Sequence, residues 1–327
     1  MSNERKVLMG IPPNAWEHPA DRAALRALKN VPGLDAILKF VLGNTTERSL
    51  RLITLASSVR VTDRQFPRVY ALHLEACRLL DMPYVPEVFV SPSPFLNAGA
   101  VGMDKPFITL NSATVDLLTD DELLAIIGHE LGHIKSGHVL YKTLLYILLQ
   151  LSQFALNIPL TGLALVGVVA ALQEWNRKSE LSADRAALLT VQEVDTYVRL
   201  LMKTAGGNNV SQMDLGEFIK QAEEYNAGGS VLDTVYKLLN ILSVSHPFPV
   251  TRVLELIGWV RSGDYDSLLN GNYRKAENTF FDDVKEAASS YREGATNATP
   301  NLDEVKDNVK KGFQQAKDMF DDLIKKK

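Results

Sequence analysis

A short helical motif with two histidines and a glutamate carries the clearest chemistry in this sequence. Residues 129–133 read HELGH, an HExxH pattern, and residues four apart on a helix lie on the same face, one turn apart. The imidazoles of His129 and His133 can therefore bind one Zn²⁺, and a catalytic zinc keeps one position open for water. Glu130 lies beside these ligands, where a carboxylate can take a proton from metal-bound water.

A third protein ligand is needed to complete such a site. The metzincin pattern requires glycine at position 136 and histidine at position 139, but this sequence has Ser136 and Val139, with His138 one position out of register. The alternative is a carboxylate from a later helix, and Glu180 and Asp184 share one helical face there. Zinc and a zinc-bound histidine N–H would be suitable partners for them, whereas on an isolated helix the two acids would indicate an ordinary solvated face.

Two helices must position these side chains. Thr119, followed three residues later by Glu122, has the form of a capping box ahead of an apolar run, which predicts a helix that continues past the HExxH motif. A further helix is expected over about residues 176–203, ending before the glycine pair Gly206 and Gly207.

The remaining sequence indicates a helix-dominated α+β fold. Residues 21–77 alternate short helical patterns with breakers, and residues 86–111 have the composition of about three short strands. We expect a zincin-like core in which this small sheet lies beside the HExxH helix. The predicted organisation is a helical N-terminal part (1–85), the core (86–265) and a helical and linker tail (266–327).

An apolar segment interrupts the predicted core. Residues 143–173 carry no charged side chain. The length of this segment exceeds the ~20 residues of one membrane crossing and falls short of the length needed for two. His133 and Glu180 flank the segment and must meet at one metal, so the chain crosses an even number of times or not at all. Two interpretations stay open: a hairpin inserted in a membrane and broken near residues 157–159, and a helical pair buried in the core or at a dimer interface.

Composition excludes several classes of partner. The 327 residues have a net charge of −4 and a single cysteine, Cys77, so neither a nucleic-acid footprint nor an intrachain disulfide is expected. The N-terminus lacks the apolar run of a secretory signal. We expect a cytoplasmic protein, and if residues 143–173 associate with a membrane, the basic residues at both ends of the segment place the active site on the cytoplasmic side. The sequence does not predict the oligomeric state.

Taken together, the motifs resemble the M48 family of zinc peptidases, which contains the HtpX-like membrane proteases and the CAAX prenyl endopeptidases. In that family an HExxH motif precedes a helix with an arginine, a ligand glutamate and an Ala-Asp pair. The residues of this sequence that match are Arg177, Glu180, Ala183 and Asp184, with Asn97-Ala98 on an edge strand and His246-Pro247 followed by Arg252.

The resemblance implies a gluzincin mechanism with one Zn²⁺ per chain. The implied ligands are His129, His133 and Glu180, and Glu130 is the implied general base. Asp184 would orient a ligand histidine.

Three further roles follow from the same resemblance. His246 would donate to the oxyanion or occupy the open zinc position, and Arg252 would pair with a buried acid. The edge strand at Asn97 and Ala98 would bind an extended or unfolded polypeptide as an added strand. A non-catalytic adaptor with the same fold, binding extended chains or membranes, is the alternative to an endopeptidase.

Overall fold

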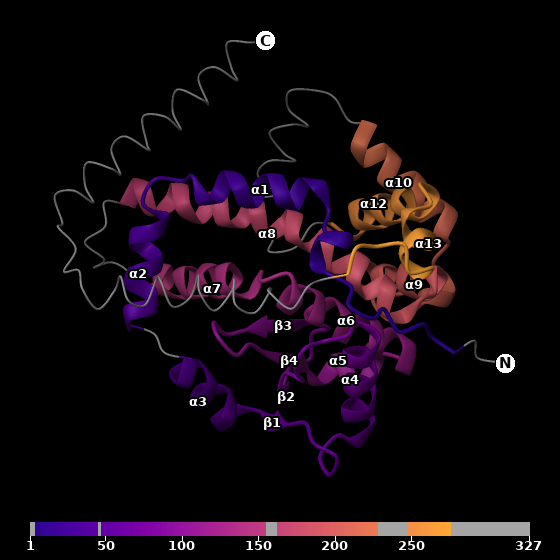
Figure 1. The fold of residues 1–327 in the computed structure, drawn as a ribbon, viewed down its shortest axis with the longest axis horizontal. Coiled ribbons are helices and arrows are strands. Elements are labelled where there is room, and N and C mark those ends of the chain that lie inside the picture. Colours follow the sequence, from indigo (N-terminus) through magenta and orange to yellow (C-terminus); the bar gives the residue numbers. More distant parts are fainter. Residues whose placement is uncertain (1–3, 45–46, 155–161, 228–247, 276–327) are drawn as a thin grey trace.

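The computed structural model describes residues 4–44, 47–154, 162–227 and 248–275 of the chain (Figure 1). Helices dominate it, which confirms the predicted α+β class. In chain order, the elements before the sheet are η1 (Pro13–Ala15), α1 (Pro19–Lys29), α2 (Leu34–Asn44), α3 (Glu47–Ser57) and α4 (Pro67–Leu79). The elements after it are α5 (Ser112–Leu117), α6 (Asp120–Lys135), α7 (Val139–Phe154), α8 (Gly162–Val191), α9 (Val194–Gly206), η2 (Val210–Gln212), α10 (Leu215–Ala227), α12 (Pro249–Arg261) and α13 (Asp264–Leu269).

Four strands form one mixed sheet in the order β1-β2-β4-β3. They are β1 (Val59–Arg60), β2 (Val88–Ser91), β3 (Ala98–Val101) and β4 (Phe107–Asn111). β2 and β4 run parallel, with Val88 opposite Ile108, whereas β3 pairs antiparallel to β4, with Ala98 opposite Leu110. The three strands expected between residues 86 and 111 are present. The two-residue β1 is an addition, because so short a segment has no detectable alternation.

One predicted helix is in fact two. Instead of a single helix over residues 176–203, α8 ends at Val191 and α9 begins at Val194. Gln192 between them adopts a left-handed conformation (φ 57°), and its side-chain amide donates hydrogen bonds to the backbone oxygens of Leu189 and Lys6. These hydrogen bonds favour a turn over a continued helix.

Two hydrophobic clusters hold the elements together. The main cluster fills the space between the sheet and α4, α6, α8 and α9, and the N-terminal residues Leu8, Ile11 and Trp16 belong to it. The second cluster joins α1 and α2 to α7 and the first half of α8. The boundaries at residues 85 and 265 stay a prediction, and residues 276–327 of the predicted tail lie outside the described residues.

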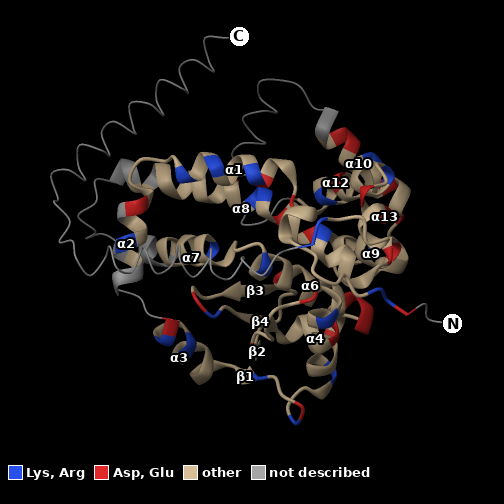
Figure 2. Ribbon diagram, viewed as in Figure 1, with Lys and Arg blue, Asp and Glu red and all other residues tan. Residues whose placement is uncertain are grey.

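The apolar segment contributes to the second cluster. Leu144, Leu145 and Leu148 of α7 are buried there, together with Val168 and Leu172 of α8. In Figure 2, α7 and the first turns of α8 are nearly free of charged residues, whereas α1 and α3 carry both acidic and basic residues. Within the described ranges no helix combines the length and the apolar character that a membrane crossing requires. The expected break at residues 157–159 lies outside those ranges.

Candidate metal centre

The helix that carries the HExxH motif begins as its sequence predicts. The Thr119 hydroxyl accepts a hydrogen bond from the backbone N–H of Glu122 (3.4 Å), and the Glu122 carboxylate accepts one from the backbone N–H of Thr119 (2.9 Å). This capping box starts α6, which continues through the motif to Lys135. His129 and His133 are 5% and 1% exposed, and their ring centroids lie 4.8 Å apart.

Two glycines allow α6 to approach α8 closely. A Cβ atom on Gly128 would lie 2.3 Å from the Thr190 hydroxyl, and one on Gly132 would lie 2.5 Å from the Cβ of Ala186. Such distances are far below normal contact, so only glycine fits at either position. The close approach brings the motif to Glu180. Two glycines four residues apart in a helix are the signal in the sequence that could have predicted it.

A Gly132→Ala variant is therefore expected to be less stable than the wild type by about 1–3 kcal/mol, the usual cost of overpacking. Urea unfolding monitored by circular dichroism measures this difference. Gly258→Ala is the matched control, because Gly258 is a helical glycine with open space around its Cβ position, and it should be neutral or stabilised by up to ~1 kcal/mol. Equal stabilities for the two variants would contradict the proposed close packing.

Three donor atoms converge between α6 and α8. His129 Nε2 lies 3.2 Å from one Glu180 carboxylate oxygen, and His133 Nε2 lies 3.2 Å from the other. Ligand atoms from these three buried residues all lie within 4.8 Å of one another. Tetrahedral zinc, with bonds of about 2.0–2.1 Å, places its ligands roughly 3.3 Å apart. Two imidazoles and a carboxylate are also a donor set that zinc prefers, so the residues present fit this metal.

The ammonium group of Lys142 also lies at these donor atoms. Its Nζ is 2.6 Å from a Glu180 oxygen and 3.3 Å from His133 Nε2. A positive group in this position shows that the donor atoms favour a cation, and a metal ion bound by them would displace it. In the sequence, Lys142 stands out only as a basic residue at the start of the apolar segment.

A second group of residues contacts His129 at Nδ1, on the side of the ring away from Glu180. Asp184 Oδ1 lies 3.2 Å from His129 Nδ1, and Arg252 on α12 donates from Nε to Asp184 Oδ2 at 2.8 Å and from a second nitrogen to Oδ1. Tyr197 on α9 donates to Asp184 Oδ1 at 2.7 Å. The structure thus brings Asp184 and Arg252 together beside a predicted ligand. Tyr197 carried no signal in the sequence, because nothing in its spacing connected it to the motif.

The two imidazoles have different protonation tendencies in the metal-free protein. Burial alone would lower the pKa of His129, but hydrogen bonds to Asp184 and Glu180 outweigh it and raise the pKa to about 9. Burial, supported by the positive charge of Lys142, holds the pKa of His133 well below its ordinary value.

The remaining predicted site residues take different positions. Glu130 is 5% exposed on α6, directly after His129. Asn97 is exposed just before the edge strand β3, and Ala98 is the first residue of that strand. β3 contacts α6, so the edge strand and the motif are neighbours. His246 lies outside the described residues, so its predicted role stays a prediction.

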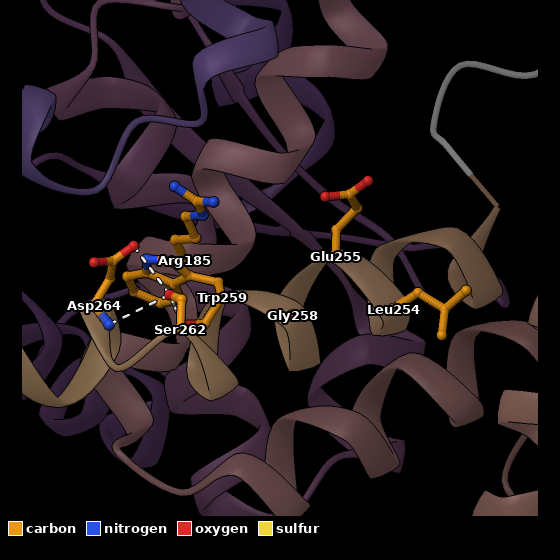
Figure 3. A pocket seen from close by; sticks show the side chains of 7 residues that line it. All are labelled: Arg185, Leu254, Glu255, Gly258, Trp259, Ser262 and Asp264. Atoms are coloured by element: carbon orange, nitrogen blue, oxygen red, sulfur yellow. Dashed lines mark hydrogen bonds between the residues drawn. The ribbon is translucent and has the colours of Figure 1, made fainter.

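A separate shallow pocket lies elsewhere, between α8, α12 and α13 (Figure 3). It is lined by Arg185, Leu254, Glu255, Gly258, Trp259, Ser262 and Asp264. The Arg185 guanidinium lies over the Trp259 ring, 4.9 Å from its centroid. None of the lining residues is one of the three converging donors His129, His133 and Glu180.

Comparison with known proteins identifies the family of the chain. A sequence model described as Peptidase family M48 matches residues 63–260. The chain belongs to this peptidase family. As an M48 member it is a metallopeptidase, that is, a hydrolase that cleaves polypeptides. No solved structure matches the chain.

Two relatives illustrate the relationship. Over 267 residues the chain is 35% identical to "Plastoglobule-localized metallopeptidase 48, chloroplastic" of Arabidopsis thaliana, covering 80% of this chain and 76% of the relative. Over 223 residues it is 26% identical to "Protease HtpX homolog" of Moorella thermoacetica, covering 60% and 73% respectively. The family resemblance inferred from the motifs is thereby confirmed.

Proposed function

We propose that this M48 peptidase is a zinc-dependent endopeptidase that hydrolyses extended or unfolded polypeptides. One Zn²⁺ per chain would be held by His129, His133 and Glu180, with Glu130 as the general base. The observation that carries the proposal is the convergence of three buried donors within 4.8 Å. This intact donor set, with Glu130 beside it, favours the endopeptidase over a non-catalytic adaptor that binds extended chains or membranes.

Each residue has a defined task in the proposed reaction. Zinc, when bound, supplies a Lewis acid that polarises the peptide carbonyl and acidifies water. The Glu130 carboxylate accepts a proton from the attacking water and returns it to the leaving amine. Asp184, held by Arg252 and Tyr197, accepts a hydrogen bond from His129 Nδ1 and keeps the ring oriented. His246 remains our proposed donor to the oxyanion.

The edge strand supports an extended substrate. β3 pairs with β4 on one side, and no strand of the described residues pairs with its other edge. The backbone oxygen of Asn97 accepts a hydrogen bond from the backbone N–H of Asn111, in line with β4. Because backbone groups alternate in direction along a strand, those of Ala98 point to the free edge. A polypeptide added there would form main-chain hydrogen bonds irrespective of its sequence.

The proposal predicts metal-dependent cleavage that favours unfolded substrates. Casein, which lacks a stable fold, should be cut at internal bonds, whereas a tightly folded protein of similar size should survive the same incubation. 1,10-Phenanthroline should abolish cleavage, and added zinc should restore it. Mass spectrometry of the fragments distinguishes internal cleavage from trimming at the ends. Cleavage that persists in the chelator would contradict zinc dependence.

Membrane contact is a further part of the proposal, with the active site on the cytoplasmic side. Residues 143–173 are uncharged, and Tyr146 within them is 52% exposed on α7. Tyrosine is enriched at membrane–water interfaces. We expect the protein to sediment with lipid vesicles and a Tyr146→Asp variant to sediment less. Full recovery in the supernatant with vesicles present would contradict membrane contact and leave the peptidase assignment untouched.

A further inference from the structure

His133 has a polar partner that the mechanism above does not use. His138 lies directly before α7, and its Nδ1 is 3.0 Å from Nδ1 of His133. On the far side of the ring, His138 Nε2 lies 3.1 Å from Asp21 Oδ2. His138 and Asp21 are both 2% exposed. A continuous chain of buried polar groups thus leads from a proposed zinc ligand to α1.

The direction of the hydrogen bonds in this chain follows from metal binding. His133 faces Glu180 with Nε2, so a metal ligated there leaves the ring proton on Nδ1. That N–H can only donate, so His138 Nδ1 must accept, and the proton of the neutral His138 ring then lies on Nε2. His138 Nε2 in turn donates to the Asp21 carboxylate. Every donor meets an acceptor when the metal is bound.

We infer that His138 and Asp21 are positioning residues of the metal centre, which orient His133 and fix the tautomer that binds zinc. This inference rests on the proposed zinc site. Each imidazole ligand would then be supported by a carboxylate. Asp184 supports His129 directly, and Asp21 supports His133 through His138. Partners of this type typically change metal affinity by 10–100-fold when they are removed.

Asp21 is well suited to end the chain of hydrogen bonds. Trp175 Nε1 donates to its Oδ1 at 3.1 Å, and the Ser182 hydroxyl donates to its Oδ2 at 2.6 Å. Burial alone would raise the pKa of Asp21, but hydrogen bonds from His138, Ser182 and Trp175 to the carboxylate help to hold that pKa below its ordinary value.

Asp21 lies outside the part of the chain that matches the family model. Asp21 belongs to α1 and precedes residues 63–260, the part that matches the family model. Figure 1 shows α1 lying along α8, the helix that carries Glu180. Helix α1 would thus supply a carboxylate that supports zinc binding, in addition to packing against α8.

Asp21→Asn is the sharpest test, because it preserves shape and changes one acceptor into a donor. If the amide nitrogen faces His138, that ring must accept at Nε2 and carry its proton on Nδ1, where it opposes the N–H of His133. If the amide is turned round, its nitrogen opposes the Trp175 N–H instead. The first arrangement breaks the hydrogen bond that His133 donates to His138, and the second leaves His138 with an uncharged acceptor in place of a carboxylate. We expect zinc affinity, measured by competition with a chromophoric chelator, to fall by at least ~10-fold.

Two variants of His138 separate positioning from simple packing. His138→Leu removes the acceptor for His133 and should weaken zinc binding by about 10–100-fold. His138→Asn places an amide oxygen near the position of Nδ1 and should recover most of that loss. The visible spectrum of the Co²⁺-substituted protein should change with His138→Leu and return toward the wild-type spectrum with His138→Asn. A packing role alone would not be rescued by asparagine.

Thr143→Val is the matched control, since it removes a buried hydroxyl whose hydrogen bonds go to the backbone of Gly102 and leaves His138 and Asp21 in place. It should lower stability without changing zinc affinity. Wild-type zinc affinity and cobalt spectra in folded Asp21→Asn and His138→Leu proteins would overturn the inference alone. A wild-type protein that binds no zinc would overturn the proposed function as well.

Discussion

A Glu130→Gln variant is expected to fold normally, to keep its zinc and to cleave casein several orders of magnitude more slowly than the wild type. Glutamine has nearly the shape of glutamate but cannot accept a proton at neutral pH, so the attacking water loses its base. Because Glu130 is not one of the three converging donors, the metal should remain. The measurement is the initial rate of casein cleavage at equal zinc content.

The control for this variant is Glu217→Gln, a change of the same type at an exposed glutamate on α10 that pairs with the equally exposed Lys220. Exposed ion pairs of this kind contribute little to stability, so activity should stay at the wild-type level. Retained activity in Glu130→Gln would show that another group acts as the base.

A Glu180→Ala variant is expected to lose its metal. Both carboxylate oxygens face imidazole nitrogens, and the residue is completely buried. Its removal leaves only two protein ligands and also leaves the Lys142 ammonium without its carboxylate partner. Zinc affinity should fall by more than the ~10–100-fold that is typical when a residue supporting a ligand is lost, and casein cleavage should fall with it.

Asp184→Ala distinguishes a ligand from its support. Asp184 faces His129 Nδ1, on the side of the ring away from Glu180. We expect a loss of about 10–100-fold in affinity or activity, with zinc still bound at saturating concentration. If Glu180→Ala kept its zinc and Asp184→Ala lost it, Asp184 would be the ligand and Glu180 the supporting residue.

Sequence spacing was sufficient to predict which residues of the candidate site share one face of a helix. His129 with His133, Glu180 with Asp184, and Thr119 with Glu122 are pairs three or four residues apart, and helical geometry alone places each pair on one face. The helix-dominated fold and the small sheet also followed from local pattern.

Contacts between distant segments could not be predicted in the same way. Asp21 reaches His138 and Tyr197 reaches Asp184 only because α1, α8 and α9 pack together. In the sequence, His138 is notable only for being out of register for a metzincin. The missed end of α8 has a similar cause, since Gln192 adopts its left-handed turn through hydrogen bonds to Lys6, which is remote in sequence.

Metal analysis of the purified protein tests the central claim most directly. The protein, dialysed against metal-free buffer and measured by inductively coupled plasma mass spectrometry, should hold about one equivalent of zinc per chain, as a site with three protein ligands should. His133→Ala, prepared in parallel and shown by circular dichroism to be folded, should hold almost none. A folded wild-type protein without metal, even after incubation with zinc, would contradict the proposed zinc peptidase.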